Sequence, residues 1–390
     1  MKRKSRIGML VFLLIASLLI VANAAAQVSV AKPVKLSIID VAGNLQLSKT
    51  AIEAFKTANP RLAADIDYLK LTAPELPSKI KAQQMADNLD TTLVLTGYDA
   101  MASGMDQDIY EQLMPQYKAA FQKSIDNYLP GAKAAYDLFK GYGIAYVFCP
   151  GGPMFTYNPE KVPNPPKTAA ELLAWAKANP GKFLYARPAN SGPGRAFLQG
   201  LPYILGDTNP KDPRTWDKTW AFLRELDNYI DYYPSGTAIV FKELGEGTRW
   251  MVASHLGWDM NQRILATIPA NYQGFFLDKT TWVTDCQFMA IPKGLDKDRL
   301  AVTIELMKWL MTPAQQAVTY DNAYFYPGPA IKGISLDMAP AESQKAIRPA
   351  IRAAYEQAIV KLPKTTQLDS AALVQAMDTW DQLVGAKVKK

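Results

Sequence analysis

An alternation of strand and helix patterns over the first part of the chain constrains the fold most. Strand patterns at residues 34–40, 66–71 and 91–96 enclose helix patterns at residues 47–55 and 78–85. Such a strand–helix–strand series predicts a parallel sheet with right-handed crossovers. Because the carboxyl ends of parallel strands meet at one edge, ligands of these sheets bind there. We therefore expect a binding edge after residues 40 and 96.

The chain is long enough to form two domains with cores of their own. It has 390 residues, of which 49% are hydrophobic and 20% charged. These values exclude a disordered or low-complexity chain.

The amino terminus has the features of an export signal. Four basic residues between Lys2 and Arg6 precede an apolar run at residues 7–22, and small residues follow up to Ala26. This order is typical of a secretory signal peptide, with cleavage after Ala24 or Ala26. An uncleaved anchor helix is the alternative, but the run is shorter than the roughly 20 residues that a bilayer span prefers. We expect a periplasmic, secreted protein.

The formal charge of +7 does not indicate a nucleic-acid partner. Four of the basic residues lie in the expected signal peptide, and three lie at the end of the chain, at Lys387, Lys389 and Lys390. The remainder holds equal numbers of basic and acidic residues, with no cluster of basic and aromatic side chains. We therefore expect no nucleic acid among the partners.

Two further segments resemble strands that pass between domains. The first is residues 140–149, which the glycines and prolines of residues 150–153 interrupt before a strand at residues 154–159. The second is residues 282–294. Beyond it, apolar spacings of three and four predict three helices, and the middle one carries Ile347, Ile351, Tyr355 and Ile359.

The order of these segments resembles the family 1 extracellular solute-binding proteins of ABC importers. The resemblance rests on short motifs in order: the strand at residues 141–146, Phe-Thr-Tyr-Asn at residues 155–158, the proline-rich helix entry at residues 162–173, Gly-Glu-Gly at residues 245–247, and Ala-Ile-Pro-Lys-Gly at residues 290–294 with the helix end at residues 307–316.

The resemblance implies a type II periplasmic-binding fold. This is an α/β fold of two lobes, each a mainly parallel sheet flanked by helices, joined by hinge strands. The implied division is a signal peptide at residues 1–26, lobe 1 at 27–145, lobe 2 at 146–290, and a return to lobe 1 at 291–390 with helices that pack across the hinge. It further implies a monomer without catalysis or cofactor, which closes on a small solute and presents it to a membrane permease.

A turn between an expected strand and an expected helix is the strongest candidate site. Its glycines allow the backbone to approach a ligand, and amides at a helix start together with an arginine bind a carboxylate, phosphate or sulfate. It also falls where the family's second lobe contacts ligand. An ordinary helix start with an arginine in solvent is the alternative. The candidate contacts are Asn190, Ser191, Gly192, Gly194 and Arg195.

Other candidate contacts follow the first-lobe strands or are aromatic. Polar groups at adjacent strand ends converge on one cleft, and aromatic rings stack on sugars or surround quaternary amines. Helix capping and core packing are the alternatives for each residue. The first-lobe candidates are Asp40, Gly43, Asn44, Thr96, Tyr98 and Asp99, and the others are Tyr157, Trp258, Asp259, Tyr324 and Tyr326.

Cys149 and Cys286 are the only cysteines of the chain. If the crossing strands run antiparallel with Ala145 beside Ala290, the two sulfur atoms face each other. An oxidising compartment then favours a disulfide, and two buried free thiols are the alternative.

These observations predict an anionic or zwitterionic solute, with a polyamine or sugar as alternatives of the same fold. Iron is disfavoured, because the tyrosine pair Tyr232 and Tyr233 precedes Gly245 and lacks a surrounding cluster of carboxylates. A secreted hydrolase is the rival class, but His255 is the only histidine. A sensory role in the same fold stays open.

Overall fold

The computed structural model describes residues 28–41 and 43–385. The expected signal peptide at residues 1–26 and the terminal lysines from Lys387 onward lie outside the described residues. Within the described ranges, no helix has both the length and the apolar character that a membrane crossing requires.

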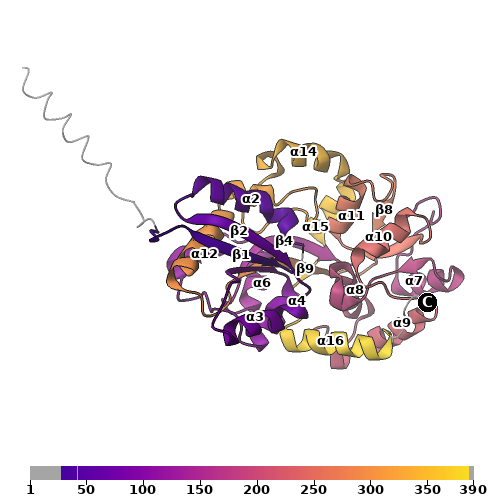
Figure 1. The fold of residues 1–390 in the computed structure, drawn as a ribbon. Coiled ribbons are helices and arrows are strands. Elements are labelled where there is room, and N and C mark those ends of the chain that lie inside the picture. Colours follow the sequence, from indigo (N-terminus) through magenta and orange to yellow (C-terminus); the bar gives the residue numbers. More distant parts are fainter. Residues whose placement is uncertain (1–27, 42, 386–390) are drawn as a thin grey trace, which may run out of the picture.

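The larger of two sheets forms the centre of lobe 1 (Figure 1). Its strand order is β10-β4-β9-β3-β1-β2, and β11 pairs with β9. The expected parallel pairing holds for β1 with both β2 and β3, whereas β9 is antiparallel to β3 and to β4. The strands are β1 (Val34–Asp40), β2 (Ala63–Lys70), β3 (Leu93–Thr96), β4 (Ile144–Gly152), β9 (Trp282–Ala290), β10 (Gly328–Pro329) and β11 (Lys364–Thr365).

Helices cover both faces of this sheet. The apolar face expected for the first helix is confirmed, since Leu47, Ala51, Ile52 and Phe55 are all buried in the lobe 1 core. The helices of this lobe are α2 (Leu45–Ala58), α3 (Glu75–Met85), α4 (Tyr98–Asp106), α5 (Lys118–Asp126), α6 (Pro130–Leu138), α12 (Lys297–Leu310), α13 (Pro313–Val318) and the 3-10 turn η3 (Leu336–Met338).

Lobe 2 is built on a smaller sheet with the order β6-β7-β5-β8. The β6–β7 pair is parallel and the other two pairs are antiparallel, so this sheet is mixed rather than mainly parallel. Its strands are β5 (Met154–Tyr157), β6 (Phe183–Leu184), β7 (Met251–Ser254) and β8 (Gln273–Phe275). Its helices are α7 (Ala169–Ala178), η1 (Pro188–Asn190), α8 (Gly192–Leu205), η2 (Pro213–Thr215), α9 (Asp217–Asp227), α10 (Thr237–Gly245) and α11 (Leu256–Ile264).

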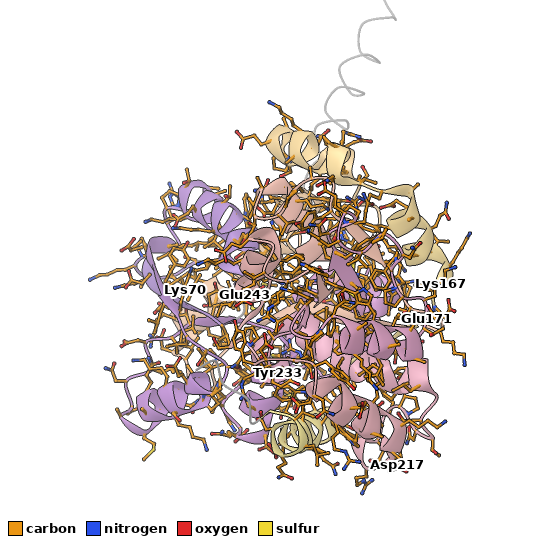
Figure 2. All side chains as sticks on the ribbon, turned by 90° about the vertical axis from the view of Figure 1, so that its right-hand side faces the viewer. Lys70, Lys167, Glu171, Asp217, Tyr233 and Glu243 are labelled. Atoms are coloured by element: carbon orange, nitrogen blue, oxygen red, sulfur yellow. The ribbon has the colours of Figure 1, made fainter. Side chains whose placement is uncertain are left out.

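Local sequence signals set where these helices begin. The hydroxyl of Thr168 accepts a hydrogen bond from the Glu171 amide at 3.1 Å, and the Glu171 carboxylate accepts one from the Lys167 amide at 2.9 Å (Figure 2). These two bonds satisfy one amide of the first turn of α7 and one amide just before the helix, neither of which has a helical partner.

The strands β4 and β9 connect the lobes, and both belong to the larger sheet along their whole length. The chain enters lobe 2 between β4 and β5 and returns between β8 and β9. The expected interruption at residues 150–153 is confirmed at Pro153, which separates β4 from β5, whereas residues 150–152 continue β4 with a register shift against β9 between Cys149 and Gly152. Gly151 has φ +85°, and a Cβ there would lie 2.1 Å from the Val283 carbonyl oxygen, so only glycine fits.

The C-terminal segment differs from the expectation in one helix. The apolar series from Ile347 to Ile359 predicts one helix, but Pro349 lacks an amide proton and divides it into α14 (Ala341–Ile347), η4 (Arg348–Ala350) and α15 (Ala353–Lys361). The last helix, α16 (Ser370–Leu383), lies along both lobes (Figure 1). Its Trp380 is buried in the lobe 2 core and donates a hydrogen bond to the Tyr185 hydroxyl at 3.0 Å.

The expected disulfide is absent, because Cys149 and Cys286 are buried free thiols. The two strands are antiparallel as expected, but Ala145 pairs with Phe288 rather than with Ala290. Cys149 consequently pairs with Asp285, and Cys286 pairs with Phe148. Because neighbouring residues of a strand face opposite sides, the two cysteine side chains leave opposite faces of the ladder.

We expect a thiol reagent such as Ellman's reagent to detect no thiol in the native protein and two per chain after denaturation without a reductant. Burial raises the pKa of Cys149 to about 12, so that its unreactive thiol form prevails at neutral pH. Absorbance of the released thiolate measures both states. A denatured, unreduced chain with no reactive thiol would contradict the structure.

Candidate functional site

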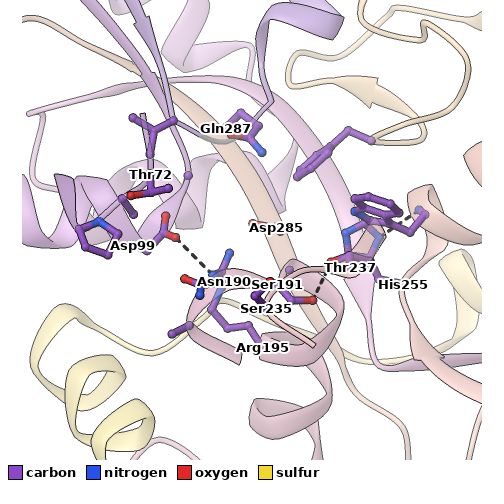
Figure 3. Close-up of a pocket in the computed structure, with 18 of the residues that line it drawn as sticks. Thr72, Asp99, Asn190, Ser191, Arg195, Ser235, Thr237, His255, Asp285 and Gln287 are labelled. Atoms are coloured by element: carbon purple, nitrogen blue, oxygen red, sulfur yellow. Dashed lines mark hydrogen bonds and ion pairs between the residues drawn. The ribbon is translucent and has the colours of Figure 1, made fainter. Parts of the chain in front are cut away.

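A cleft of about 570 Å³ separates the two lobes (Figure 3). Lobe 1 contributes Thr72 and Asp99, lobe 2 contributes Ser191 and Arg195, and the crossing strand β9 contributes Asp285. Polar and apolar side chains line it together. It has the size and mixed lining of a small-molecule site.

Helices from both lobes begin at this cleft. In lobe 2, α8 follows β6 and α11 follows β7, and these two strands are parallel, so both helices start at the same edge. In lobe 1, α4 follows β3, and its cap residue Gly97 lines the cleft. Helix starts carry amide protons and a partial positive charge, which favour an anion.

The turn before α8 is anchored by hydroxyl groups. Ser191 caps the helix by accepting a hydrogen bond from the Gly194 amide at 3.0 Å, and its hydroxyl lies 2.7 Å from that of Thr237 at the start of α10. Pro193 has no amide proton. The amide of Gly192 is therefore the first-turn donor for which the described part of the chain supplies no acceptor.

Arg195 reaches from lobe 2 toward lobe 1. Its guanidinium lies 3.5 Å from the Asp99 carboxylate of α4, and its Nε donates to the Gln367 side chain at 3.1 Å. Arg195 is only 7% exposed, so its charge is poorly hydrated. Among the described residues that line the cleft it is the only cation.

His255 lies at the end of β7 and caps α11. Its Nδ1 accepts a hydrogen bond from the Trp258 amide at 3.4 Å, whereas Nε2 is buried and has no partner among the described residues. Burial, with a smaller contribution from the nearby Arg195 charge, lowers the pKa of His255 to about 3. The imidazole is therefore neutral at physiological pH.

Asp285 faces the cleft from the crossing strand β9. Its Oδ1 accepts hydrogen bonds from the Cys286 amide at 3.0 Å and from the Gln367 side chain at 2.9 Å. Burial raises the pKa of Asp285 to about 6, an effect that Arg195 partly opposes. Gln287, two residues along the same face, accepts a hydrogen bond from Asn44 at 2.7 Å.

An aromatic pair forms part of the wall. Trp258 of α11 and Tyr324 of lobe 1 meet edge to face at 5.5 Å between ring centres. Gly43, at the exposed start of α2, has φ +75°, and a Cβ there would lie 3.0 Å from the Tyr324 hydroxyl. Gly43 therefore gives Tyr324 its room rather than contacting the cavity.

The structure brings seven of the sixteen candidate contacts to the cleft wall. The N-terminal turn of α8 contributes most of them, as expected from its position between a strand and a helix. These residues are Asp99, Asn190, Ser191, Gly192, Arg195, Trp258 and Tyr324.

Three first-lobe candidates serve the packing of lobe 1 instead. Asp40 accepts the Asn44 amide at 2.8 Å and so holds the start of α2. Thr96 is buried and donates to the Gly97 carbonyl. Tyr98 is buried between the edges of Phe139 and Phe288. With Asn44 bonded to Gln287, these residues lie behind the wall rather than in it.

The remaining second-lobe candidates also have structural partners. Asp259 is fully buried and accepts hydrogen bonds from Thr156 at 2.8 Å and Tyr355 at 2.7 Å, besides its ion pair with Arg263. Gly194 is required because a Cβ there would lie 2.3 Å from the Ala186 carbonyl oxygen.

Two aromatic candidates likewise lie away from the cavity. Tyr157 packs against Phe275 on the small sheet. The Tyr326 hydroxyl donates to Glu356 at 3.1 Å.

Several residues that line the cleft are not among the sixteen candidates. Asp285 and Gln287 lie two residues apart on the expected crossing strand at residues 282–294. This spacing puts both side chains on one face of the strand, and it predicts that they reach the cleft together. His255 directly follows the end of β7. Like the α8 turn, it therefore lies at the carboxyl end of a parallel strand, where ligands bind. Thr72 likewise follows the expected strand at residues 66–71, whereas Ser235 and Thr237 follow no such pattern and are brought in only by the tertiary fold.

The tyrosine pair considered for iron lies outside the cleft lining. Tyr232 donates to Glu243, and Tyr233 donates to Asp227 at 2.7 Å. Within residues 28–41 and 43–385, no group of three or more His, Cys, Asp or Glu side chains is placed to hold a metal ion.

Two α/β lobes, a pair of crossing strands and a polar cleft between them define the class of two-lobed binding proteins. Solved structures of this class share the fold at low identity, and no curated protein matches significantly. The binding protein AfuA from Actinobacillus pleuropneumoniae, solved with fructose-6-phosphate, has a TM-score of 0.64 and 12% identity over 90% of this chain and 99% of its own. Iron-bound HitA from Pseudomonas aeruginosa has a TM-score of 0.62 and 14% identity, with 90% and 99% covered.

A third similar structure is the spermidine/putrescine transporter substrate-binding protein PotD from Streptococcus pneumoniae. Its TM-score is 0.60 at 16% identity, with 90% of this chain and 98% of that chain covered. The model of the family described as bacterial extracellular solute-binding protein matches residues 50–350, more than half of the chain. The chain belongs to this family of solute-binding proteins, which are not enzymes.

Replacement of Asp285 by Asn should remove a pH dependence of stability. The folded-state pKa of about 6 lies above the ordinary 3.8, so the folded protein binds this proton more tightly than the unfolded chain. The protonated Asp285 carboxyl therefore adds about 3 kcal/mol to the free energy of unfolding below about pH 4. This contribution is lost as the pH rises through 6. Urea unfolding between pH 4 and pH 7 measures it.

Asn keeps the Oδ1 acceptor for Cys286 and Gln367, which limits other effects of the change. The exposed Asp106→Asn at the end of α4 is the matched control. We expect the stability of Asp285→Asn relative to wild type to rise with pH over this range. Parallel curves for the wild type and Asp285→Asn would contradict the burial of an ionisable Asp285.

Proposed function

We propose that the protein is exported to the periplasm and serves an ABC importer, capturing a small polar solute with an anionic group and delivering it to the permease. The observation that carries this proposal is a buried arginine in a cleft walled by both lobes. Arg195 belongs to lobe 2, and the Asp99 carboxylate that it approaches belongs to lobe 1.

The electrostatics of the lobe 2 wall favour an anionic group. The guanidinium of Arg195 and the amide of Gly192 come from the same first turn of α8, and the turn also lies at the positive end of the helix dipole. A carboxylate or phosphate at this place would gain charge-assisted hydrogen bonds in a poorly hydrated setting. Ser191 and Thr237 add hydroxyl groups beside it.

The opposite charges in the cleft favour a solute that also donates hydrogen bonds. Asp99 and Asp285 line the same cavity as Arg195, so the carboxylates outnumber the cation. A solute made only of acceptors would meet repulsion from them. A zwitterion, or an anion with hydroxyl groups, complements both signs of charge.

Closure of the lobes is the proposed mechanism. A solute that touches residues of both lobes stabilises the closed form by its differential affinity for that form. The strands β4 and β9 join the lobes and are the segments that would absorb the rotation. The closed monomer then presents one composite surface to the permease, and a sensor partner would read the same surface.

The alternative solutes and the rival activity fit less well. A polyamine would pair with Asp99 and Asp285 but would face Arg195 and the helix starts. A neutral sugar would leave the charge of Arg195 without a partner from the solute. A hydrolase would use His255 as its base, but Nδ1 is occupied by the Trp258 amide, and burial keeps the pKa of the ring near 3.

Arg195→Ala should weaken binding of anionic solutes by roughly 10- to 150-fold, the equivalent of one charged hydrogen-bonding group. A thermal-shift screen over organic acids, phosphate esters, polyamines and sugars identifies the solute, because binding to the native state raises the melting temperature. Each variant is compared with its own solute-free melting temperature, since loss of a buried ion pair also lowers stability.

The matched control is Arg214→Ala, which removes an exposed arginine of lobe 2 that pairs with Asp212. It should bind like the wild type. If polyamines alone raise the melting temperature and Arg195→Ala binds them unchanged, the anionic class is wrong.

A further inference from the structure

Gly192 lines the lobe 2 side of the cleft together with His255 and Asp285. A Cβ built on Gly192 would lie 3.3 Å from Asp285 Oδ2 and 3.5 Å from His255 Nε2, so it would meet no closer atom outside the neighbouring residues. The space beyond Gly192 Cα, on the side where a Cβ would project, is therefore bordered by two polar atoms from different elements. Figure 3 shows the labelled residues of this region, His255 and Asp285, around the same cavity.

The histidine atom at this space is a hydrogen-bond donor. Because His255 Nδ1 accepts from the Trp258 amide, the proton of the neutral ring is on Nε2. His255 is 1% exposed, and Nε2 has no acceptor among the described residues. A buried donor without an acceptor is destabilising, and an acceptor on a solute that reaches it would relieve that loss.

The aspartate atom at this space is an acceptor. Both hydrogen bonds that the described residues donate to Asp285 reach Oδ1. Oδ2 borders the space beyond Gly192 Cα. Above a pKa of about 6 the carboxylate is ionised, so Oδ2 accepts and does not donate.

We propose that His255, Asp285 and Gly192 form a subsite for a hydroxyl group, so that the solute is a hydroxylated anion such as a sugar phosphate, polyol phosphate or hydroxy acid. This proposal rests on the proposed function, since Arg195 and the α8 turn hold the anionic group. A hydroxyl accepts from His255 Nε2 and donates to Asp285 Oδ2 at the same time.

The same pair of atoms discriminates against other groups. An ammonium group can donate to Asp285, but it leaves the His255 donor facing a cation. A carboxylate or phosphate accepts from His255 but repels Asp285. A methyl group satisfies neither atom, and a site built for a hydroxyl rejects such an analogue strongly because its polar atoms stay unpaired.

Six probes of matched size test the subsite. The phosphate series is 2-hydroxyethyl phosphate, O-phosphoethanolamine and propyl phosphate, and the carboxylate series is 4-hydroxybutanoate, 4-aminobutanoate and pentanoate. Calorimetric titration at pH 7.5 gives the dissociation constants. We expect the hydroxyl member of the series that binds to exceed its amino and methyl analogues by about tenfold or more.

Gly192→Ala places a methyl group beside these atoms and keeps the backbone amide, and its Cβ, 3.3 Å from Asp285 Oδ2, requires that side chain to shift by a few tenths of an ångström. Its readout is the ratio of affinities between the hydroxyl and methyl probes, which should fall toward one. Gly236→Ala is the matched control, because a Cβ there meets nothing within 4 Å and Gly236 likewise lies at the start of a helix beside the cleft, directly before α10. It should keep the wild-type ratio.

His255→Asn provides a second test, because Asn retains the cap of α11 but does not extend to the position of Nε2. It should lose the same preference. His255 is also the only histidine, so a tag-free chain gives one imidazole signal in a long-range proton–nitrogen spectrum. That signal should show an Nε2-protonated ring that shifts on addition of 2-hydroxyethyl phosphate more than with propyl phosphate.

The outcomes separate this proposal from the proposed function. Anionic probes that bind through Arg195 without a hydroxyl preference, or with the amino analogue preferred, overturn the subsite alone. A hydroxyl preference that survives in Gly192→Ala and His255→Asn overturns it too. A protein that binds none of the six probes and instead binds polyamines overturns both.

Discussion

The antiparallel ladder between β4 and β9 is the interaction on which the rest of the molecule depends. All nine residues of each strand are buried, and the ladder joins β10 on one side to β3 on the other within the larger sheet. It also carries the chain into lobe 2 and back. Because a shift of one residue would turn every side chain to the opposite face, the register fixes which polar groups reach the cleft. Asp285 and Gln287 reach it, whereas Cys149 and Cys286 leave opposite faces and stay reduced.

The cleft combines groups that neither lobe holds alone. The α8 turn of lobe 2 supplies Arg195 and an amide, α4 of lobe 1 supplies Asp99, and the ladder supplies Asp285. In our proposal the anionic end of the solute lies at the α8 turn and a hydroxyl lies between His255 and Asp285. This arrangement explains how Arg195 can bind an anion in a cavity that also holds two carboxylates. Asp99 accepts a hydrogen bond from Arg195, and Asp285 would accept one from the hydroxyl group of the solute.

Much of the fold could be predicted from the sequence, because it follows from local patterns. The parallel pairing of β1 with β2 and β3, the buried face of α2 and the start of α8 all depend on residues close together in the chain. The position of the α8 turn can be predicted for the same reason, because its cap and helix start lie within residues 190–195. The pairing of Cys149, the partners of Asp259 and the role of Tyr157 depend on register and on contacts over a hundred or more residues, which one sequence does not record. Pro349 indicates a helix break from the sequence alone, but the apolar spacing from Ile347 to Ile359 favours one continuous helix.

In the proposed mechanism the two lobes close on a solute held between them. Spin labels at Lys79→Cys on α3 of lobe 1 and Lys242→Cys on α10 of lobe 2 occupy exposed positions, and the buried native thiols should stay unlabelled. Double electron–electron resonance then measures the distance between the lobes with and without 2-hydroxyethyl phosphate. We expect a shorter and narrower distance distribution with the solute, and no such change in Arg195→Ala. An unchanged distribution at a concentration that saturates the melting-temperature shift would contradict it.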